Sequence, residues 1–353
     1  MKVVLLAPLP PPSGGIASWA VRMLNTKLKN DWKVEIVDEK LIGRSSHGDN
    51  NKKKLLVELK RCFNIWKNLI RELKDPEAIV VHACTAATTT GMLRDSASCV
   101  ITHFFRRKYI IHFRCTIPNL MKSPLKRFVC NMLCRISDVV IVLNEESREY
   151  VSNISRSRVE LVPNFVEDSV IEENKDRLYH PIVKRILYTG GVTIEKGCAE
   201  IIEAAKSFPD IQFRLVGNIR KEISELDKPS NVLLTGVQSK VVVQEEINAA
   251  DLFIFFTHMD SEGFANSLVE AMAAGLPCIV TDWSANAEMI EDKGGVVLPI
   301  HDIKGLIGAI EGLKDDEKAR SKFGKWNIQK VRNEYSESVI TGKYVDIYES
   351  ITR

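Results

Sequence analysis

The chain alternates short apolar runs with longer amphipathic stretches. The short runs are rich in Val, Ile, Leu and Phe and are bounded by Gly, Pro or polar residues, which is typical of strands buried on both faces of a parallel sheet. The stretches between them have the spacing of amphipathic helices. An alternation of strand and helix predicts an α/β protein. Strands are expected at residues 1–8, 33–37, 78–81, 108–115, 138–143, 159–163, 185–191, 211–217, 231–235, 252–256, 278–281 and 296–299.

A chain of 353 residues exceeds what one hydrophobic core comfortably organises, so two domains are expected. We predict an N-terminal Rossmann-like domain over residues 1–165, a linker over 166–184 and a second domain over 185–330. The predicted linker is acidic and polar and shows no periodicity. The charge is divided as well. Residues 1–165 hold 27 Lys and Arg against 15 Asp and Glu, a balance of +12, which leaves −9 for the rest of a chain whose net charge is +3.

A basic N-terminal half favours an anionic partner: a nucleic acid, a membrane surface or a phosphorylated acceptor. No zinc-finger, helix-turn-helix or RNP-like pattern is present, so no nucleic acid is expected. Two basic amphipathic segments, 52–73 and 121–135, fit either surface helices of a Rossmann-like domain or helices that dock on an anionic membrane. No apolar run reaches membrane-spanning length, and residues 3–9 fit a first strand better than a signal peptide. A cytoplasmic location follows, with peripheral contact at the inner face of the membrane left open.

The stretch 251–282 organises the second half of the chain. An apolar run predicts a strand, a polar loop follows, and a helix rich in small residues is expected over 265–274. Gly275 fits the end of that helix, and Pro277 prevents its continuation before the next strand. Ligands of open α/β sheets bind where such loops leave the carboxyl ends of strands, so chemistry is expected in this loop.

Two carboxylates in this stretch are candidate sugar ligands. Glu262 lies in the loop, and Glu270 follows eight positions later on an otherwise apolar helix, where an unpartnered carboxylate would be costly. The helix N-terminus between them offers backbone N–H groups and a positive dipole end, which suit a diphosphate. An ionised carboxylate can accept from two neighbouring sugar hydroxyls. The alternative is a first-turn Glu that favours the helix dipole, followed by a solvated helix Glu.

Residues 262–277, EGFANSLVEAMAAGLP, resemble the EGF-x-N-x-x-x-E-A-M-A-x-G-x-P motif of retaining glycosyltransferases of family 4, the glycosyltransferase group 1 enzymes. The resemblance implies a GT-B fold, in which two Rossmann-like domains face a central cleft, and a nucleotide diphosphosugar donor. It implies that Glu262 lies near the transferring hexose and Glu270 on the nucleotide ribose. In relatives the position of Val237 lies beside the nucleotide base. A C-terminal helix, here residues 331–353, packs back on the N-terminal domain. The backbone amides that would face the hexose and diphosphate belong to Gly263, Phe264, Ala265, Asn266, Ser267 and Leu268.

Further positions match the same family. Gly15, ahead of a helix, permits close backbone approach of a ligand and matches the family's glycine loop near the donor phosphate. Lys196 matches the Lys of the family's G-R-L-x-x-x-K-G pattern and can neutralise a diphosphate. Gly191 stands where the family usually has Arg, so one phosphate-binding guanidinium is missing. His112 follows a buried strand, where a lone His is commonly structural, but its position matches a family His that approaches the transferring sugar.

The resulting prediction is a retaining hexosyltransferase that uses a glycan or lipid-linked acceptor, in bacterial-type surface polysaccharide synthesis. Neither cofactor nor metal is expected, because the chain lacks a D-x-D carboxylate pair and its eight cysteines fit buried reduced thiols. Two alternatives stay open. One is a nucleotide-sugar 2-epimerase of similar fold, and the other, motivated by Gly191, is a catalytically degenerate nucleotide-sugar-binding protein.

Overall fold

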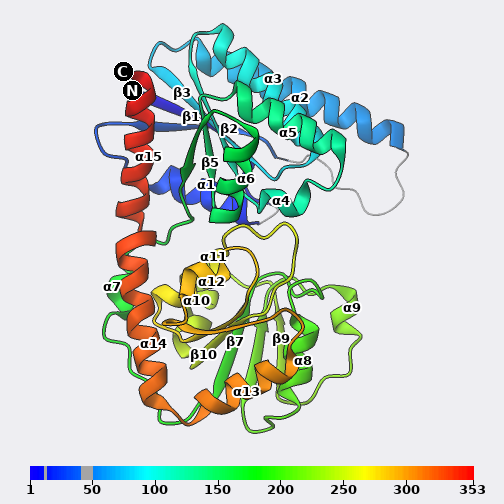
Figure 1. Cartoon of the computed structure of the whole chain (residues 1–353), viewed down its shortest axis with the longest axis vertical. Helices are drawn as coiled ribbons and strands as arrows, with labels where there is room; N and C mark the ends of the chain where they lie inside the picture. The colour runs from blue at the N-terminus through cyan, green and yellow to red at the C-terminus, as the bar shows by residue number, and fades with distance from the viewer. Residues whose placement is uncertain (12–13, 41–50) are drawn as a thin grey trace. The chain divides into compact units, whose positions relative to one another are not determined.

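The computed structural model describes residues 1–11, 14–40 and 51–353, and these residues form two compact units (Figure 1). Unit 1 comprises Met1–Pro163 together with Ile340–Arg353, and unit 2 comprises Asn164–Val339. Each unit contains one six-stranded parallel sheet. The α/β class and the two Rossmann-like units predicted from the sequence are therefore confirmed. Part of the polar stretch 44–54, expected as a loop, falls on residues 41–50 and lies outside the described residues.

Unit 1 has the strand order β2-β1-β3-β4-β5-β6. β1, β3, β4 and β5 are almost completely buried, which agrees with their continuous apolar sequences. In Figure 1 the helices α2, α3 and α5 lie side by side along this sheet. The strands are β1 Lys2–Ala7, β2 Lys33–Asp38, β3 Ala78–Thr85, β4 Lys108–Phe113, β5 Val139–Val142 and β6 Arg158–Leu161. The helices are α1 Gly15–Asn25, α2 Asn51–Leu73, α3 Thr89–Phe104, α4 Ile117–Leu120, α5 Pro124–Ile136, α6 Glu145–Ile154 and α15 Glu337–Thr352, of which residues from Ile340 onward belong to this unit.

Unit 2 has the strand order β12-β11-β10-β7-β8-β9. β8 and β9 lie in sequence order on one side of β7, and β10, β11 and β12 lie in sequence order on its other side. The direction in which the chain adds strands therefore reverses between β7 and β10. The carboxyl ends of two such strands diverge into a crevice. The strands are β7 Arg185–Thr189, β8 Gln212–Val216, β9 Val232–Gly236, β10 Leu252–Phe255, β11 Cys278–Thr281 and β12 Gly295–Leu298. The helices are α7 Asp168–Asn174, α8 Cys198–Ala205, α9 Lys221–Ser224, α10 Lys240–Ala249, α11 Asn266–Ala273, α12 Asn286–Ile290, α13 Ile303–Lys314 and α14 Glu317–Lys330, followed by the π-helical turn Val331–Tyr335.

The segment 166–184 differs from the linker expected there. All of it belongs to unit 2, and it contains the short helix α7. Beyond α7, the Arg177 guanidinium donates to the Ala274 carbonyl at 2.9 Å, and the Tyr179 hydroxyl donates to the Gly275 carbonyl at 2.9 Å. The segment resembles a linker in sequence because most of its residues are polar, and only a few of its apolar side chains, such as Ile171 and Val183, are buried.

Two other expectations change in detail. The helix expected over 121–135 is α5, which begins later than expected, because Ser123 caps it through the Lys126 N–H and Pro124 is its first residue. The segment 331–353, expected to pack on the first domain, is divided at Ile340, and only the residues from Ile340 onward belong to unit 1. Among the described residues, no helix has both the length and the apolarity needed to cross a membrane.

Candidate active site

Lys196 and Glu262 meet at the reversal of strand order in unit 2. Lys196 follows β7 and Glu262 follows β10, and the Lys196 Nζ forms an ion pair with the Glu262 Oε2. The two side chains are only 16% and 12% exposed. The ammonium also lies 5.2 Å from the centre of the Phe255 ring. Because water screens this pair poorly, the ammonium offers an anionic ligand a strong and localised charge.

The loop that carries Glu262 is held by hydrogen bonds to its carbonyl groups. The Ser284 hydroxyl is 3.1 Å from the Glu262 carbonyl and 2.7 Å from the Gly263 carbonyl. The Asn164 amide donates to the Phe264 carbonyl at 2.7 Å. These contacts fix the path of the backbone into α11 and hence the direction of its first N–H groups. Sequence reasoning missed both Ser284 and Asn164, because neither belongs to the 262–277 motif.

Helix α11 starts at Asn266, and its N-cap residue Ala265 makes no side-chain capping bond among the described residues. The first-turn N–H groups of a helix have no partner within it, so they are suited to an anion. The Phe264 and Leu268 side chains are buried in the unit, which leaves their backbone as the part able to face a ligand. Ser267 is half-buried.

Glu270 and Val237 complete the predicted donor residues of unit 2. Glu270 is half-buried one turn into α11, and its neighbours Val269, Ala271 and Met272 are fully buried. Val237 is exposed and follows β9, which lies two strands from β7 in the sheet. The structure thus brings Lys196 and Glu262 into contact, with Glu270 on the helix that follows. Val237 lies apart from them, directly after the strand at the edge of the sheet.

Gly15 and His112 are the two predicted site residues of unit 1. Trp19 lies on the same helix as Gly15 and packs against His112. Gly15 begins α1 directly after the β1 loop, and Trp19 lies one turn further along that helix. The Trp19 ring packs edge-on against the His112 ring at 5.6 Å and lies 4.7 Å from the Arg114 guanidinium carbon. His112 lies in β4 and is completely buried.

His112 belongs to a buried chain of hydrogen bonds. The Arg114 Nη1 is 3.1 Å from the His112 Nε2, the His112 Nδ1 is 3.1 Å from the His82 Nε2, and the His82 Nδ1 is 2.7 Å from the Tyr348 hydroxyl. A guanidinium can only donate, so the His112 Nε2 accepts and its Nδ1–H donates to His82. His82 must then carry its own proton on Nδ1 and donate to Tyr348. Both rings are therefore neutral in this arrangement, and contact between the His112 Nε2 and a sugar requires displacement of Arg114. The catalytic assignment of His112 stays a prediction.

The buried rings of His82 and His112 make the stability of the protein depend on pH. Burial and the nearby Arg114 lower the pKa of His82 to about 3 and hold the pKa of His112 well below its usual value. Below pH 6.5 the unfolded chain gains protons that these buried rings do not, so their contribution to stability is complete above pH 6.5 and is lost as the pH falls. Each ring is expected to lower the free energy of unfolding by about 1.4 kcal/mol per pH unit below 6.5.

Urea unfolding of the wild type and of His82→Gln between pH 7 and pH 5 checks this prediction. Glu39, whose pKa burial raises to about 8, acts with the opposite sign in both proteins, so the difference between their slopes is the quantity to compare. The His82→Gln variant should have the shallower slope. Equal slopes would show that His82 is protonated in the folded protein.

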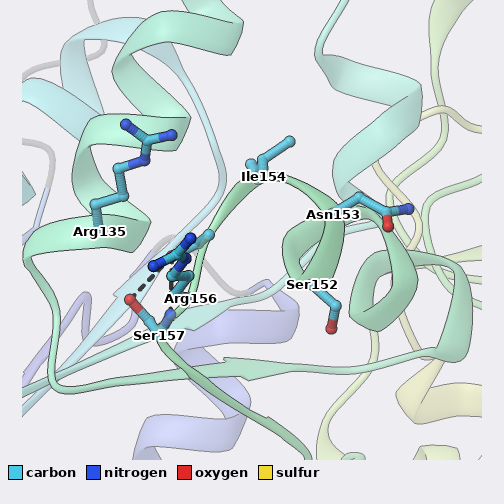
Figure 2. A pocket seen from close by; sticks show the side chains of 7 residues that line it. Arg135, Ser152, Asn153, Ile154, Arg156 and Ser157 are labelled. Carbon is cyan, nitrogen blue, oxygen red and sulfur yellow. Dashed lines mark hydrogen bonds between the residues drawn. The ribbon is translucent and has the colours of Figure 1, made fainter.

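A cavity of about 790 Å³ opens elsewhere on unit 1 (Figure 2). Arg135 lines it from the end of α5, and the other lining residues, 152–157, comprise the last turn of α6 and the loop that leads to β6. The cavity therefore lies at the amino ends of β5 and β6. Ligands of parallel sheets bind at the opposite edge, so this cavity is not the candidate active site.

The comparison with protein families decides what unit 2 resembles. Residues 171–330 match the family model of glycosyl transferases group 1. The resemblance to the group 1 glycosyl transferases is confirmed. The matched residues include β7, α8, β10 and α11, and therefore Lys196, Glu262 and Glu270.

Curated relatives and solved structures agree with this family. The chain is 23% identical to the capsular polysaccharide biosynthesis glycosyltransferase CapM of Staphylococcus aureus, over 63% of each protein. It is 25% identical to a phosphatidyl-myo-inositol mannosyltransferase of Mycolicibacterium smegmatis, over 44% of this chain and 42% of that protein. These alignments span less than two thirds of the relatives' lengths. Among solved structures, sucrose-phosphate synthase from Thermosynechococcus elongatus superposes with a TM-score of 0.79 at 14% identity, covering 100% of this chain and 99% of that one. Anabaena HepE in complex with UDP gives 0.73 at 15% identity, covering 99% and 100%. The GT-B class of fold is thus confirmed.

Proposed function

We propose that this protein is a retaining glycosyltransferase that moves a hexose-type sugar from a nucleotide diphosphosugar to a glycan or lipid-linked acceptor. The observation that carries the proposal is the shielded Lys196–Glu262 pair at the strand reversal of unit 2, beside the N-terminus of α11. Relatives support the acceptor class. One acts in capsular polysaccharide biosynthesis, and another, from Campylobacter jejuni, is an N-acetylgalactosaminyltransferase acting on a diphospho-undecaprenol sugar. A role in surface polysaccharide synthesis fits these relatives.

In the proposed mechanism Lys196 and the first N–H groups of α11 bind the donor diphosphate. As the bond between the sugar and the diphosphate breaks, negative charge grows on the leaving oxygen, and fixed positive groups stabilise that charge without rearranging. Glu262 then exchanges its ion pair with Lys196 for hydrogen bonds to hexose hydroxyls, which it orients. Glu270 holds the ribose hydroxyls. Attack by the acceptor on the face that the diphosphate leaves retains the anomeric configuration and requires no protein nucleophile.

A panel of nucleotide sugars tests the proposal directly. A true donor should raise the melting temperature of the protein, because a ligand that binds only the folded state stabilises it. The best ligand is then incubated with glycan and lipid-linked acceptors, and NMR of the product reads the anomeric configuration. An inverted product would contradict the retaining mechanism. A sugar epimerised at C2 would indicate the epimerase, and binding with neither transfer nor hydrolysis would indicate a degenerate binding protein.

Gly191 offers a gain-of-function prediction. A Cβ on Gly191 would meet only the Thr193 methyl group, at 3.7 Å, and its φ is not in the left-handed range. We therefore expect Gly191→Arg to fold and to tighten donor binding, by roughly tenfold if the new guanidinium forms one charged hydrogen bond with the diphosphate. Isothermal titration with the donor measures the change.

Gly190 supplies the matched control. Its φ is +141°, and a Cβ there would lie 2.9 Å from the Tyr188 hydroxyl, so Gly190→Ala should lower the melting temperature where Gly191→Ala does not. If Gly191→Arg melts at the wild-type temperature and binds the donor no better, the position does not face the diphosphate.

We further propose that unit 1 contacts anionic membranes peripherally. The apolar stripe expected along 52–73 is only partly buried: Leu69 lies in the core, whereas Leu56, Leu59 and Phe63 are more than half exposed. On α5, Leu125 and Phe128 are also more than half exposed, beside Lys126 and Arg127. Exposed apolar side chains among basic ones are typical of helices that lie in a membrane interface.

Co-sedimentation with vesicles tests this contact. The protein should bind phosphatidylglycerol-containing vesicles at low salt and not phosphatidylcholine vesicles, because each basic residue near an anionic surface contributes about 1 kcal/mol. Leu59→Ser with Phe63→Ser should weaken binding, whereas Val241→Ser, at an exposed apolar position of unit 2, should not. Absence of binding to anionic vesicles would reject the proposal and leave the basic residues to a phosphorylated acceptor.

A further inference from the structure

Three metal-ligating side chains converge in unit 2 beside the candidate active site. Glu200 lies in the first turn of α8, His258 in the loop after β10, and His301 in the loop after β12. One ligand atom of each residue lies within 4.8 Å of those of the other two. Chain segments separated by more than forty residues thus deliver two imidazoles and one carboxylate to one place.

The cluster is incompletely satisfied by hydrogen bonds. The His301 Nδ1 is 2.8 Å from the Glu200 Oε1, and the His258 and His301 rings are 4.3 Å apart at 54°. Within the part of the chain that the structure describes, the buried Glu200 Oε2 and His258 Nδ1 have no hydrogen-bond partner. Buried polar atoms without partners are uncommon in native proteins and call for an explanation such as an ion.

We propose that Glu200, His258 and His301 bind a divalent transition metal ion, with Zn²⁺ as its representative. Neutral imidazole and carboxylate are preferred ligands of Zn²⁺, Co²⁺ and Ni²⁺, whereas Mg²⁺ and Ca²⁺ prefer oxygen ligands alone. Metal–ligand distances of about 2.0–2.1 Å place tetrahedral ligands about 3.3–3.4 Å apart. Modest side-chain rotations reach this arrangement, and the fourth position stays open for water or another ligand.

The backbone around the ligands is already ordered. The His258 N–H donates to the Glu195 carbonyl at 2.9 Å, which joins the β10 loop to the turn before α8. His301 adopts a left-handed φ of +62°, and Asp302 directly after it caps α13 through the Gly305 N–H. The ligands are therefore carried by fixed segments, so binding needs side-chain adjustment and no refolding of the loops.

A second cluster, His82, Cys84 and His112 in unit 1, is a poorer candidate. The ring nitrogens of both histidines already form hydrogen bonds, and the Arg114 guanidinium, 3.1 Å from the His112 Nε2, opposes a cation. Among the described residues, no Arg or Lys side chain forms a hydrogen bond or ion pair with the unit 2 cluster, and its His301 side chain is half exposed, which gives an ion a path of entry.

The proposed metal joins three segments that border the donor site without using the donor-binding groups. Lys196 lies in the turn just before α8, which carries Glu200, and the loop of His258 continues to Glu262. The expectation that the chain needs no metal rested on the missing D-x-D pair and on the cysteines, so it does not bear on histidine ligands. The proposed role is to stabilise this edge of unit 2, and it does not depend on sugar transfer.

Untagged full-length protein, stripped with a chelator, provides the test. Isothermal titration with ZnCl₂ should show one saturable site, and the melting temperature should rise with Zn²⁺ but not with Mg²⁺ or Ca²⁺. Glu200→Gln and His301→Gly should each weaken Zn²⁺ binding at least tenfold. Glycine accepts the left-handed φ of residue 301, so His301→Gly removes a ligand without straining the loop. His180→Gln, which alters another histidine–carboxylate pair of unit 2, should bind Zn²⁺ as the wild type does.

The spectrum of bound Co²⁺ identifies the ligands. Histidine and carboxylate ligation should give d–d bands without the near-ultraviolet charge-transfer band of a thiolate. A thiolate band would assign the ion to one of the eight free cysteines and overturn the proposal. The proposal is equally wrong if the wild type shows no saturable Zn²⁺ binding, or if Glu200→Gln and His301→Gly both retain wild-type affinity.

Discussion

Replacing Glu262 with Gln is expected to lower kcat by about 10²-fold to 10³-fold, the usual cost of losing one oriented electrostatic group in an active site. The amide keeps the shape of the side chain and removes its charge. The amide has one acceptor oxygen where the carboxylate has two, and it carries no charge to pair with the Lys196 ammonium in the free protein. Because Lys196 is then free to bind the diphosphate, donor affinity should fall much less than turnover.

Steady-state kinetics with the donor identified by the nucleotide-sugar panel measure this effect. Glu203→Gln is the matched control, since Glu203 lies on α8 and forms an ion pair with Lys206 near the surface. The melting temperature of each variant shows whether the fold is intact. A Glu262→Gln protein with wild-type kcat and a raised donor KM would place Glu262 in uniform substrate binding and contradict its assignment to the transferring sugar.

Gly197→Ala is expected to cause the largest loss of stability, about 2–5 kcal/mol. Gly197 directly follows Lys196 and has a φ of +72°, which costs an L-residue about 1–2 kcal/mol. A Cβ there would also lie 2.0 Å from the backbone carbonyl oxygen of Phe256, which cannot rotate away. Relieving such overpacking costs about 1–3 kcal/mol more. The close approach of these backbones is what brings Lys196 to the loop of Glu262.

Gly236→Ala separates the two causes. Gly236 has the same φ of +72°, but a Cβ there would meet no atom within 4 Å, so only the conformational cost of about 1–2 kcal/mol is expected. Urea unfolding followed by tryptophan fluorescence compares the two variants. Equal destabilisation would show that the backbones of Gly197 and Phe256 are further apart than this structure has them.

The strands could be predicted because they are buried on both faces. A short, continuous apolar run between two polar turns is typical of a buried strand, so the run 252–256 predicts one. The structure has β10 at Leu252–Phe255. The elements that were missed lack such a run. Helix α6 carries charged and polar residues and is recognisable mainly by its Asn144 cap, which accepts from the Ser147 N–H. Helix α7 is seven residues long and lies in a segment without periodicity.

The site was predictable residue by residue but not as an arrangement. Lys196 and Glu262 are 66 positions apart, and their contact depends on β7 and β10 being neighbours, which no local pattern specifies. The same holds for the buried histidines. His112 contacts His82 from β3, and His82 in turn contacts Tyr348 from α15, 266 positions further along the chain. A motif identifies which residues carry chemistry, whereas the order of strands in the sheet decides which of them meet.

The division of unit 1 between the two ends of the sequence has a consequence for how the protein is made. Unit 2 is one continuous segment, Asn164–Val339, so all of its residues are translated before the part of α15 that belongs to unit 1. Unit 1 lacks Tyr344 and Tyr348 until then, and its buried His82 waits for the Tyr348 hydroxyl. Domains of a nascent chain commonly fold in the order of their synthesis. Here unit 1 is completed last, and a chain cut short before residue 340 contains every residue of unit 2 but lacks the α15 side chains that are buried in unit 1.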